Sequence, residues 1–372
     1  MRIVDGTYAT AKIFTDNVED YALAQIQMIC NNETASQSVI RVMPDVHPGK
    51  IGPIGLTMRV TDAILPGLVG IDIGCGVSVM KLKTKRIEFQ KLDTVIRERI
   101  PSGFRIRSKA HRFSEDFPFE ELRCYKHINP EKAKLSMGTL GGGNHFIEVD
   151  QSEDGQLYVV IHSGSRSLGK AVAEYYVKTG QDFLKEQGVD VPYELTFLKG
   201  TLMENYLHDQ QIVTQFAEQN RAAMLDELAK EMKLKAEDEY SCIHNYIELG
   251  DDYRMLRKGA ISAKSGETVI IPVNMRDGVI LGIGKGNSDW NCSAPHGSGR
   301  LLKRTDVESR YTVSSFKKEM KGIYSSCISK DTLDEAPFAY RSLDEIEGQI
   351  ADTVDVRQIL TPVYNFKAGS NE

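Results

Sequence analysis

The stretch GLVGIDIGCGVSVMKL, residues 67–82, joins a glycine-rich turn to a run of apolar and β-branched residues. This pattern is typical of a strand that starts from a tight turn. Four further runs of this kind lie beside glycine-rich loops: FIEV (146–149), YVVIHS (158–163), TVIIPV (268–273) and GVILGIG (278–284). Because glycine allows positive φ angles and a close approach of the backbone to a ligand, we expect strands whose ends converge on glycine-rich loops.

Two long segments without proline are expected to be helices, residues 168–187 and 208–232. Near the C-terminus, Ser342 followed by Glu345 predicts a capping-box start for a further helix over 342–354. In the segment 208–232, apolar residues recur in steps of four or eight and form one stripe, which indicates packing against a core: Ile212, Phe216, Met224 and Leu228.

Strand runs mixed with helical segments predict the α+β fold class. The chemically suggestive motifs run from residue 45 to about 300 with no linker, repeat or change of composition between them. We therefore expect one large interwoven unit over 1–372, with mixed sheets and flanking helices and a helical segment at about 167–240. The 372 residues allow a sizeable core, and 41% hydrophobic and 26% charged residues are ordinary for a globular protein.

Several classes of protein are excluded by the sequence. No apolar run approaches the length of about 18 residues that a membrane span needs, and the start MRIVDGTYATAKIF lacks the features of a secretory signal. The six cysteines are irregularly spaced, so they do not indicate a disulfide framework. We expect a cytoplasmic protein with no membrane partner. The net charge of −6 argues against nucleic-acid binding by bulk positive charge, but it leaves room for a local basic surface.

One stretch is locally basic and contains an aromatic residue, Phe104, with Phe113 beside it. Such a stretch could follow a phosphate backbone. A solvated loop or helix face is the simpler interpretation of these residues alone. The basic residues, which stand against the single acid Glu98, are Arg97, Arg99, Arg105, Arg107, Lys109 and Arg112.

Four of the eight histidines stand at the ends of apolar runs or inside glycine loops: His145, His162, His244 and His296. One histidine beside a strand is usually structural, but four in similar settings indicate a metal site, because imidazole is the commonest metal ligand. The turn GIDIGCG adds a carboxylate and a thiol, Asp72 and Cys75. A thiolate can bind metal; with imidazoles it favours zinc, while the carboxylate leaves room for manganese or iron.

The strand alternation in NHFIEV predicts that Asn144 and Glu148 face one side and His145 the other. Glu148 could accept hydrogen bonds from a purine, or it could be an ordinary salt-bridged residue at a strand end. The loops HSGSR and HGSGR each end in arginine, Arg166 and Arg300. Glycine and serine N–H groups followed by arginine suit a phosphate, although surface loops of this composition are common.

Seven motifs, taken in order, resemble those of the RtcB RNA ligases and cover nearly the whole chain: PDVHPGKIGPIG, GLVGIDIGCGV, GTLGGGNHFIEV, VIHSGSRSLG, IHNYIE, SAPHGSGR and EAPFAY. The resemblance implies an enzyme that uses GTP and two Mn²⁺ ions. It would join RNA 2′,3′-cyclic phosphate or 3′-phosphate ends to 5′-hydroxyl ends.

The implied reaction runs through a guanylyl-histidine at His296, which would attack the α-phosphate of GTP. The GMP would then pass to the RNA 3′-phosphate, and the 5′-hydroxyl would displace it. By the same resemblance, the metal ligands are Asp72, Cys75, His145, His162 and His244, and Arg166 and Arg300 hold phosphates of GTP or RNA. The guanylate pocket is implied to contain Asn144, Glu148, Asn245, Pro272, Val273, Asn274, Met275, Gly297, Ser298, Gly299, Tyr340 and Lys367.

The sequence departs from the family pattern in three places. PVNMRDGVIL (272–281) replaces a PGSMG-type stretch, so that Asn274 or Arg276 would have to substitute for a lost contact. Lys303–Arg304 replaces a Ser-Arg pair, and the tail NFKAGSNE is longer than the usual Lys-Gly end. These features resemble the shorter bacterial branch that is associated with a release-factor-like protein and with RNA repair.

Two other functions remain open at this point. The first is a metal-dependent RNA end-processing phosphodiesterase that does not ligate, which the altered segment 272–281 leaves possible. The second is a non-catalytic RNA-binding subunit, although a pure binder has no need of a thiolate, a carboxylate and several imidazoles.

Overall fold

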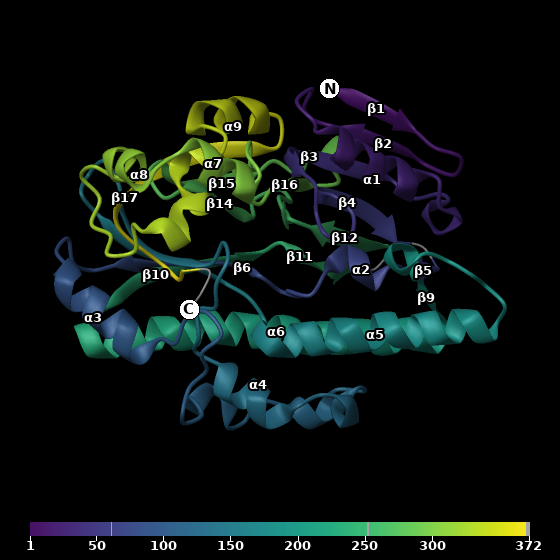
Figure 1. The fold of residues 1–372 in the computed structure, drawn as a ribbon, viewed down its shortest axis with the longest axis horizontal. Coiled ribbons are helices and arrows are strands. Elements are labelled where there is room, and N and C mark those ends of the chain that lie inside the picture. The colour runs from purple at the N-terminus through teal and green to yellow at the C-terminus, as the bar shows by residue number, and fades with distance from the viewer. Residues whose placement is uncertain (61, 251–252, 370–372) are drawn as a thin grey trace.

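Two large sheets organise the part of the chain that the computed structural model describes, residues 1–60, 62–250 and 253–369 (Figure 1). The first has six strands in the order β1-β2-β3-β4-β12-β11, and only β2 and β3 pair in parallel. Its strands are β1 (Arg2–Asp5), β2 (Thr10–Ile13), β3 (Ile40–His47), β4 (Ile54–Val60), β12 (Arg254–Lys258) and β11 (Asn245–Leu249).

The second sheet has seven strands in the order β10-β6-β8-β7-β17-β15-β14, and all its neighbours pair antiparallel. The five runs predicted to be strands are confirmed as β6, β7, β8, β14 and β15. The strands are β10 (Ala236–Ile243), β6 (Gly76–Leu82), β8 (Leu157–Ser163), β7 (Phe146–Gln151), β17 (Val354–Lys367), β15 (Gly278–Gly284) and β14 (Thr268–Asn274). Two small pairs join β13 (Ala260–Ser262) to β16 (Ser293–Pro295) and β5 (Ala63–Ile64) to β9 (Leu198–Lys199).

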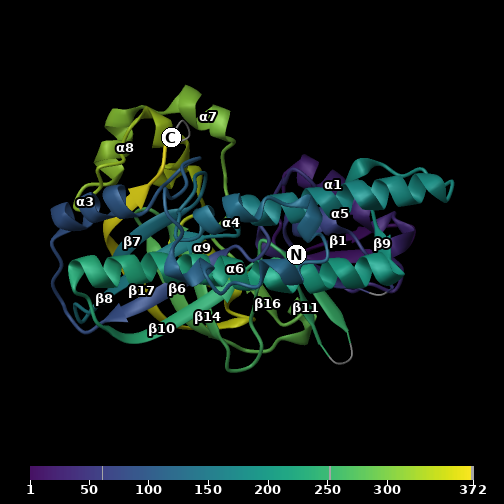
Figure 2. The same cartoon turned by 90° about the horizontal axis from the view of Figure 1, so that it is seen from below.

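Two long helices, α5 (Arg166–Glu186) and α6 (Gly200–Met232), cross one side of the molecule (Figures 1 and 2). α6 starts eight residues earlier than expected, because Met203, Tyr206 and Leu207 continue its buried face. It contributes side chains to the core beneath the six-stranded sheet and, further along, to the core beneath the seven-stranded sheet. The expected stripe from Ile212 to Leu228 is buried, so its assignment to the core is confirmed.

The remaining helices are short. Ser342 caps α9 by accepting a hydrogen bond from the Glu345 N–H at 3.3 Å, but the helix ends at Ile350 because β17 begins at Val354. The other α-helices are α1 (Asp20–Cys30), α2 (Pro66–Val69), α3 (Phe89–Arg99), α4 (Pro130–Ser136), α7 (Arg304–Arg310), α8 (Val313–Glu319) and α9 (Leu343–Ile350). The 3₁₀ helices are η1 (Glu33–Ala35), η2 (Arg112–Ser114), η3 (Phe119–Glu121), η4 (Tyr125–His127), η5 (Tyr193–Leu195), η6 (Ser288–Trp290), η7 (Lys330–Glu335) and η8 (Pro337–Ala339).

The mixture of sheets and helices confirms the α+β class. The segment expected to be helical, about 167–240, contains α5 and α6 but also β9 and the start of β10. Among the helices that the structure describes, none combines the length and the apolar character that a membrane span requires. The single unit over 1–372 stays a prediction.

Candidate metal and nucleotide site

Five neighbouring strands bring the candidate residues to one edge of the seven-stranded sheet. Gly76 pairs with Ile243 on one side and with Ser163 on the other, while Phe146 pairs with His162 and with Lys367. Because these strands alternate in direction, the ends of β10, β8 and β17 lie beside the starts of β6 and β7. The residues at or next to these ends therefore share one edge: His244, Cys75, His162, His145 and Lys367.

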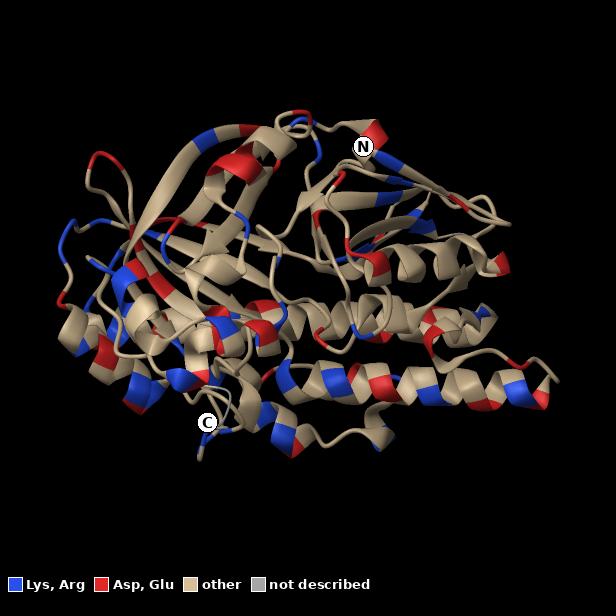
Figure 3. Cartoon of the chain, turned by 45° about the horizontal axis from the view of Figure 1, so that its top comes forward, with Lys and Arg blue, Asp and Glu red and all other residues tan. Residues whose placement is uncertain are grey.

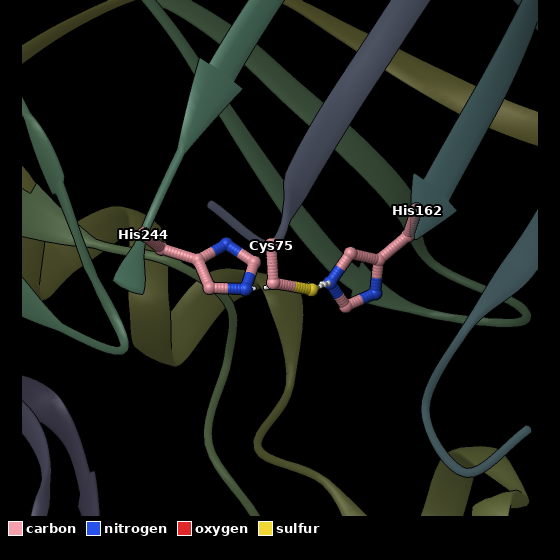
Figure 4. A group of neighbouring side chains, drawn as sticks. All are labelled: Cys75, His162 and His244. Atoms are coloured by element: carbon pink, nitrogen blue, oxygen red, sulfur yellow. Dashed lines mark hydrogen bonds between the residues drawn. The ribbon is translucent and has the colours of Figure 1, made fainter. Parts of the chain in front are cut away.

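The imidazoles of His162 and His244 point toward the side chain of Cys75 (Figure 4). Its Sγ lies 3.4 Å from Nε2 of His145 and 3.4 Å from Nε2 of His162, which is itself 3.4 Å from Nε2 of His244. The Oδ2 atom of Asp72 lies 3.0 Å from Nε2 of His145. In the described parts of the chain these residues form two overlapping groups, Cys75–His162–His244 and Asp72–Cys75–His145, with ligand atoms within 4.8 Å of one another.

The hydrogen bonds of the two central imidazoles suit a bound cation. Nδ1 of His145 donates to the Leu140 carbonyl at 2.9 Å, and Nδ1 of His162 donates to the Asn144 carbonyl at 3.1 Å. These partners assign the proton to Nδ1 and leave the Nε2 lone pair facing the cluster. A lone pair of His145 and a carboxylate oxygen of Asp72 repel each other unless a proton or a cation stands between them. The donor set therefore fits a metal, and the shared Cys75 fits two ions.

Burial controls the protonation of the metal-free cluster. It raises the pKa of the Cys75 thiol, as does the charge of Asp72, and it lowers the pKa of His162 and of His244. Burial alone would raise the pKa of Asp72, but without a cation, a proton between Nε2 of His145 and Asp72, together with the charge of Arg166, brings it below its usual range. A cation would reverse the effect on Cys75, because a coordinated thiol loses its proton.

Two buried polar residues of α6 support these strand ends, and the sequence analysis did not identify them. The guanidinium of Arg221 donates to the carbonyls of Gly74 at 3.1 Å and Ser163 at 3.0 Å. Asn220 accepts from the N–H of Gly138 at 2.8 Å and donates to the carbonyl of Gly164 at 3.0 Å. Their signal in the sequence is a polar Asn-Arg pair within a mainly apolar helix face.

Glycine is required where two site residues approach the backbone. A Cβ atom on Gly164 would lie 2.1 Å from Oδ1 of Asp72, and a Cβ atom on Gly141, at φ +84°, would lie 2.0 Å from Nη1 of Arg166. Asp72 can therefore accept a hydrogen bond from the N–H of Ser165 at 3.0 Å. Because these loop positions are glycines, the side chains of Asp72 and Arg166 can approach the backbone closely.

His296 reaches the cluster from the strand pair β13–β16. Its ring centroid lies 4.7 Å from that of His244. Nδ1 of His296 lies 2.7 Å from Oδ2 of Asp45, a fully buried residue at the end of β3. If Nδ1 donates to this carboxylate, the Nε2 lone pair is free to act as a nucleophile. Asp45 was not identified from the sequence, although it stands in the motif PDVHPG.

A cavity of about 820 Å³, part of it open to solvent, lies against His296 and His162. Most of the residues expected in a guanylate pocket line it: Asn144, Glu148, Pro272, Val273, Asn274, Met275, Gly297, Ser298, Gly299, Tyr340 and Lys367. The lining also includes Arg300, which was expected to hold phosphate, and four residues that were not foreseen: His47, Phe146, Arg304 and Glu335.

Asn245 differs from this set. It is not among the described residues that line the cavity. Its side chain instead donates to the carbonyl of Asp72 at 3.2 Å and accepts from the N–H of Gly259 at 2.9 Å. Asn245 thus braces the turn that carries the metal ligands, because it lies at the first position of β11, directly after His244.

One wall of the cavity carries an acid surrounded by cations. Glu335 lies 2.7 Å from Nζ of Lys367, 3.2 Å from Nη1 of Arg300 and 2.6 Å from Nη1 of Arg304. Burial would raise the pKa of Glu335, but these three cations lower it to about 2. The guanidinium of Arg300 also covers the ring of Tyr340, at 5.1 Å from its centroid. Arg304 also pairs with the buried Asp334, so three cations stand against two acids and leave one positive charge that suits a phosphate.

Glu148, another acid of the cavity lining, is almost fully buried, and its pKa shifts in the opposite direction from that of Glu335. Burial raises its pKa to about 8, against the hydrogen bond from Asn365 and the charge of Lys367. The neighbouring Asp150 on the same strand face is also fully buried, and burial together with the charge of Glu148 raises its pKa. A ligand that donates N–H groups to Glu148 would favour its ionised form.

Arg166 and Arg276 do not line the cavity. Arg166 lies beside the metal ligands, with Nη1 3.3 Å from Nδ1 of His145, and it donates to the carbonyl of Gly103 at 3.4 Å. Of the two residues offered as replacements in the segment 272–281, Asn274 lines the cavity, whereas Arg276 pairs with Asp277 and Glu319.

Four of the six basic residues of the stretch 97–112 are paired with acids, which weakens the interpretation that this stretch follows a phosphate backbone. Arg99, Arg107 and Arg112 form ion pairs with Glu231, Glu227 and Asp226 of α6, at 3.2, 2.7 and 2.6 Å, and Arg97 pairs with Asp93 at 2.9 Å. Figure 3 shows basic and acidic segments side by side around α3. The three acids of α6 lie more than 100 positions along the chain, so local composition did not reveal them.

Comparisons with known proteins agree with the resemblance found in the motifs. A family model described as "tRNA-splicing ligase RtcB" matches residues 25–124 and 116–368. The chain is 30% identical to "RNA-splicing ligase RtcB" of Escherichia coli strain K12 over 404 aligned positions, which cover 96% of this chain and 97% of that protein. It is also 27% identical to "tRNA-splicing ligase RtcB" of Aeropyrum pernix, over 97% of this chain and 93% of that one.

Proposed function

This chain belongs to the RtcB family of RNA ligases, and from that premise we propose that it joins RNA ends with GTP and Mn²⁺. The proposed reaction links a 2′,3′-cyclic phosphate or 3′-phosphate end to a 5′-hydroxyl end through a guanylyl-histidine at His296. One observation carries this proposal: His296, beside the buried Asp45, faces a cavity and lies next to a buried cluster of thiol, imidazole and carboxylate groups.

His296 supplies the nucleophile in this proposal. Asp45 accepts the Nδ1–H and fixes the ring, so that Nε2 keeps its lone pair and points to the reacting group. Nε2 forms a bond to the α-phosphorus of GTP, the bond from that phosphorus to the bridging oxygen breaks, and pyrophosphate leaves with the electron pair. Asp45 is a positioning residue, because it acts through His296.

The cavity lining supplies the choice of nucleotide. The carboxylate of Glu148 suits the ring N–H and the amino group on the Watson–Crick edge of guanine. Adenine presents a ring acceptor where guanine has the N–H, so the buried carboxylate would face a lone pair. Lys367, Arg300 and Arg304 provide the positive charge for the phosphates, while Tyr340 offers a ring for stacking.

Asp72, Cys75, His145, His162 and His244 would hold the Mn²⁺ ions. When bound, these ions supply positive charge that offsets the charge of the phosphates. The protein's own contribution is to keep the imidazole Nε2 atoms directed inward through carbonyl partners on Nδ1. A role in RNA repair, a cytoplasmic location and a release-factor-like partner remain parts of this proposal.

Covalent labelling with GTP that carries ³²P in its α-phosphate tests the proposal. The wild type should form an acid-labile adduct with GTP and Mn²⁺ but not with ATP, and His296→Ala should form none. Asp45→Asn should slow labelling by about 10²- to 10⁴-fold, because it disturbs the tautomer of His296. His127→Ala, a change of an exposed histidine on η4, is the matched control and should label normally.

Failure of the wild type to label in the presence of Mn²⁺ would overturn the guanylyl-histidine. If His296→Ala still opened 2′,3′-cyclic phosphate ends without GTP and the wild type did not ligate, the protein would be an end-processing phosphodiesterase. That alternative rests on the altered segment 272–281, where Asn274 is held by Asp277 at 2.8 Å.

A further inference from the structure

His47 is a second histidine of the cavity, and the proposed reaction has so far given it no role. It is the last residue of β3 and lines the cavity together with His296. Asp45 binds both rings: its Oδ2 lies 2.7 Å from Nδ1 of His296, and its carbonyl oxygen lies 2.8 Å from Nδ1 of His47. One fully buried residue therefore holds two imidazoles close together at the cavity wall.

The hydrogen bond to Asp45 fixes the tautomer of His47. A carbonyl oxygen can only accept, so Nδ1 of His47 carries the proton, and Nε2 of the neutral ring keeps its lone pair. Within the described chain, this Nε2 has no hydrogen-bond partner. Burial lowers the pKa of His47 to about 4, and the nearby His296 and Arg300 also lower it, whereas Asp45 opposes them. The ring is therefore neutral near pH 7 and can accept a proton.

One step of the proposed reaction must release a proton. When the 5′-hydroxyl attacks the guanylylated RNA end, its oxygen forms a bond to the terminal phosphorus of that RNA. The bond from this phosphorus to the oxygen that bridges to GMP breaks, GMP leaves with the electron pair, and the hydroxyl proton passes to a base. The RNA phosphorus is joined through one oxygen to the phosphorus that His296 carried before, so the attack takes place close to His296.

The other proton acceptors of the described cavity lining are engaged elsewhere. Glu335 contacts three cations, which lower its pKa to about 2 and make it a poor base. Glu148 is assigned to guanine, and Nε2 of His162 faces the metal ligands. This leaves His296 and His47, and of these two only His47 has no other role in the proposed reaction.

We propose that His47 is the general base of the sealing step, and that its Nε2 takes the proton of the RNA 5′-hydroxyl and later releases it to water. This inference rests on the proposed function and adds to it the residue that activates the second RNA end. The negative charge of the bound phosphates favours the imidazolium that forms. Because Nδ1 stays bound to the Asp45 carbonyl in both protonation states, the ring does not need to turn between them.

An RNA that already carries GMP on its 3′-phosphate tests this step alone. Such an activated RNA needs no GTP, so its sealing to a 5′-hydroxyl RNA in the presence of Mn²⁺ isolates the attack of the hydroxyl. His47→Ala should slow this sealing by about 10²- to 10⁴-fold, and the loss should be at least about 10 times larger than the loss in labelling by GTP. His127→Ala, which changes an exposed histidine, is the matched control and should seal and label as the wild type does.

Free imidazole distinguishes a missing base from a damaged site. A small base can enter the space that the substitution leaves, so sealing by His47→Ala should rise in proportion to the imidazole concentration. The wild type and His127→Ala, measured in the same solutions, should show no rise. If imidazole left the sealing by His47→Ala unchanged, His47 would not be the base.

Three results of the sealing assay would also overturn the proposal. Sealing by His47→Ala at the wild-type rate would show that the step does not need this ring. Equal losses of labelling and sealing would make His47 a support of His296. Slow sealing by His296→Ala with normal sealing by His47→Ala would assign the proton to His296. A wild type that fails to label with GTP would instead refute the guanylyl-histidine, which the activated RNA bypasses, so the two failures can be told apart.

Discussion

At the scale of single residues, the site depends on charged groups that the fold removes from water. Asp45 is fully buried against His296, and Glu335 is buried among three cations. Glu148 is different, because the residues around it do not compensate for its burial, and its pKa is raised. An ionised Glu148 is therefore costly in the empty cavity and becomes favourable only beside a ligand that donates to it.

This state of Glu148 predicts a pH dependence of stability. Its pKa is raised to about 8 in the folded protein, whereas an unfolded glutamate titrates near about 4.3. The contribution of Glu148 is fully present below the unfolded pKa and is lost as the pH rises towards 8, because the folded state retains a proton that the unfolded chain has released. The free energy of unfolding of Glu148→Gln should therefore fall less between about pH 5 and pH 8 than that of the wild type, by on the order of 1–4 kcal/mol.

Urea unfolding of both proteins across this pH range measures the difference. Glu131→Gln, which changes an exposed carboxylate on α4, is the control and should follow the wild type. Asp150 also makes the free energy of unfolding fall as the pH rises, and it does so in all three proteins, because burial raises its pKa as well. If the free energies of unfolding of Glu148→Gln and of the wild type changed in parallel between about pH 5 and pH 8, the pKa of Glu148 would not be raised in the folded protein.

At the scale of elements, the antiparallel order of β10, β6, β8, β7 and β17 is what gathers the ligands. Each strand contributes one residue at or next to the end that lies at the shared edge. α6 then fixes these ends through Asn220 and Arg221, whose side chains form hydrogen bonds with backbone groups of the turns and strand ends. Regular structure positions the site, and the glycine loops between the strands allow the close contacts.

Substitution of one loop glycine tests this arrangement. Gly164→Ala should displace Asp72, because the added Cβ would lie 2.1 Å from its Oδ1 atom. We expect Mn²⁺ affinity to fall by about 10- to 100-fold, as measured by metal titration of the purified variant. Gly348→Ala in α9 is the control, since its Cβ meets no atom within 4 Å, and it should leave metal binding unchanged. Wild-type affinity in Gly164→Ala would show that Asp72 is not a ligand.

At the scale of the whole molecule, the site lies where the two large sheets meet. Asp45 belongs to the six-stranded sheet, Cys75 and His162 to the turn and strand ends of the seven-stranded one, and α6 packs against both. A ligand bound between the sheets would stabilise both at once. We therefore propose that the chain unfolds as one cooperative unit.

Two probes follow this unfolding. The fluorescence of Trp290, the one tryptophan of the sequence, reports on its stacking with Phe14 of the N-terminal region, and far-UV circular dichroism reports mainly on α5 and α6. The two transitions should coincide, and Mn²⁺ at 100 times its Kd should shift both by about 2.7 kcal/mol. Separate transitions, or a shift in one probe alone, would indicate two units.

Local patterns in the sequence predicted five strands, two long helices and the kind of chemistry. Apolar, β-branched runs beside glycine-rich turns predicted β6, β7, β8, β14 and β15, and the histidines, Asp72 and Cys75 predicted a metal site, because these signals are local. Which of these groups meet depends on the folded chain. It paired His296 with Asp45 and placed Asn245 against the turn of Asp72.

The folded chain also pairs Arg99, Arg107 and Arg112 of the basic stretch with acids of α6. Contacts of this kind join residues that are far apart in the chain. They follow from strand order and helix packing, and the composition of either partner's own segment does not encode them.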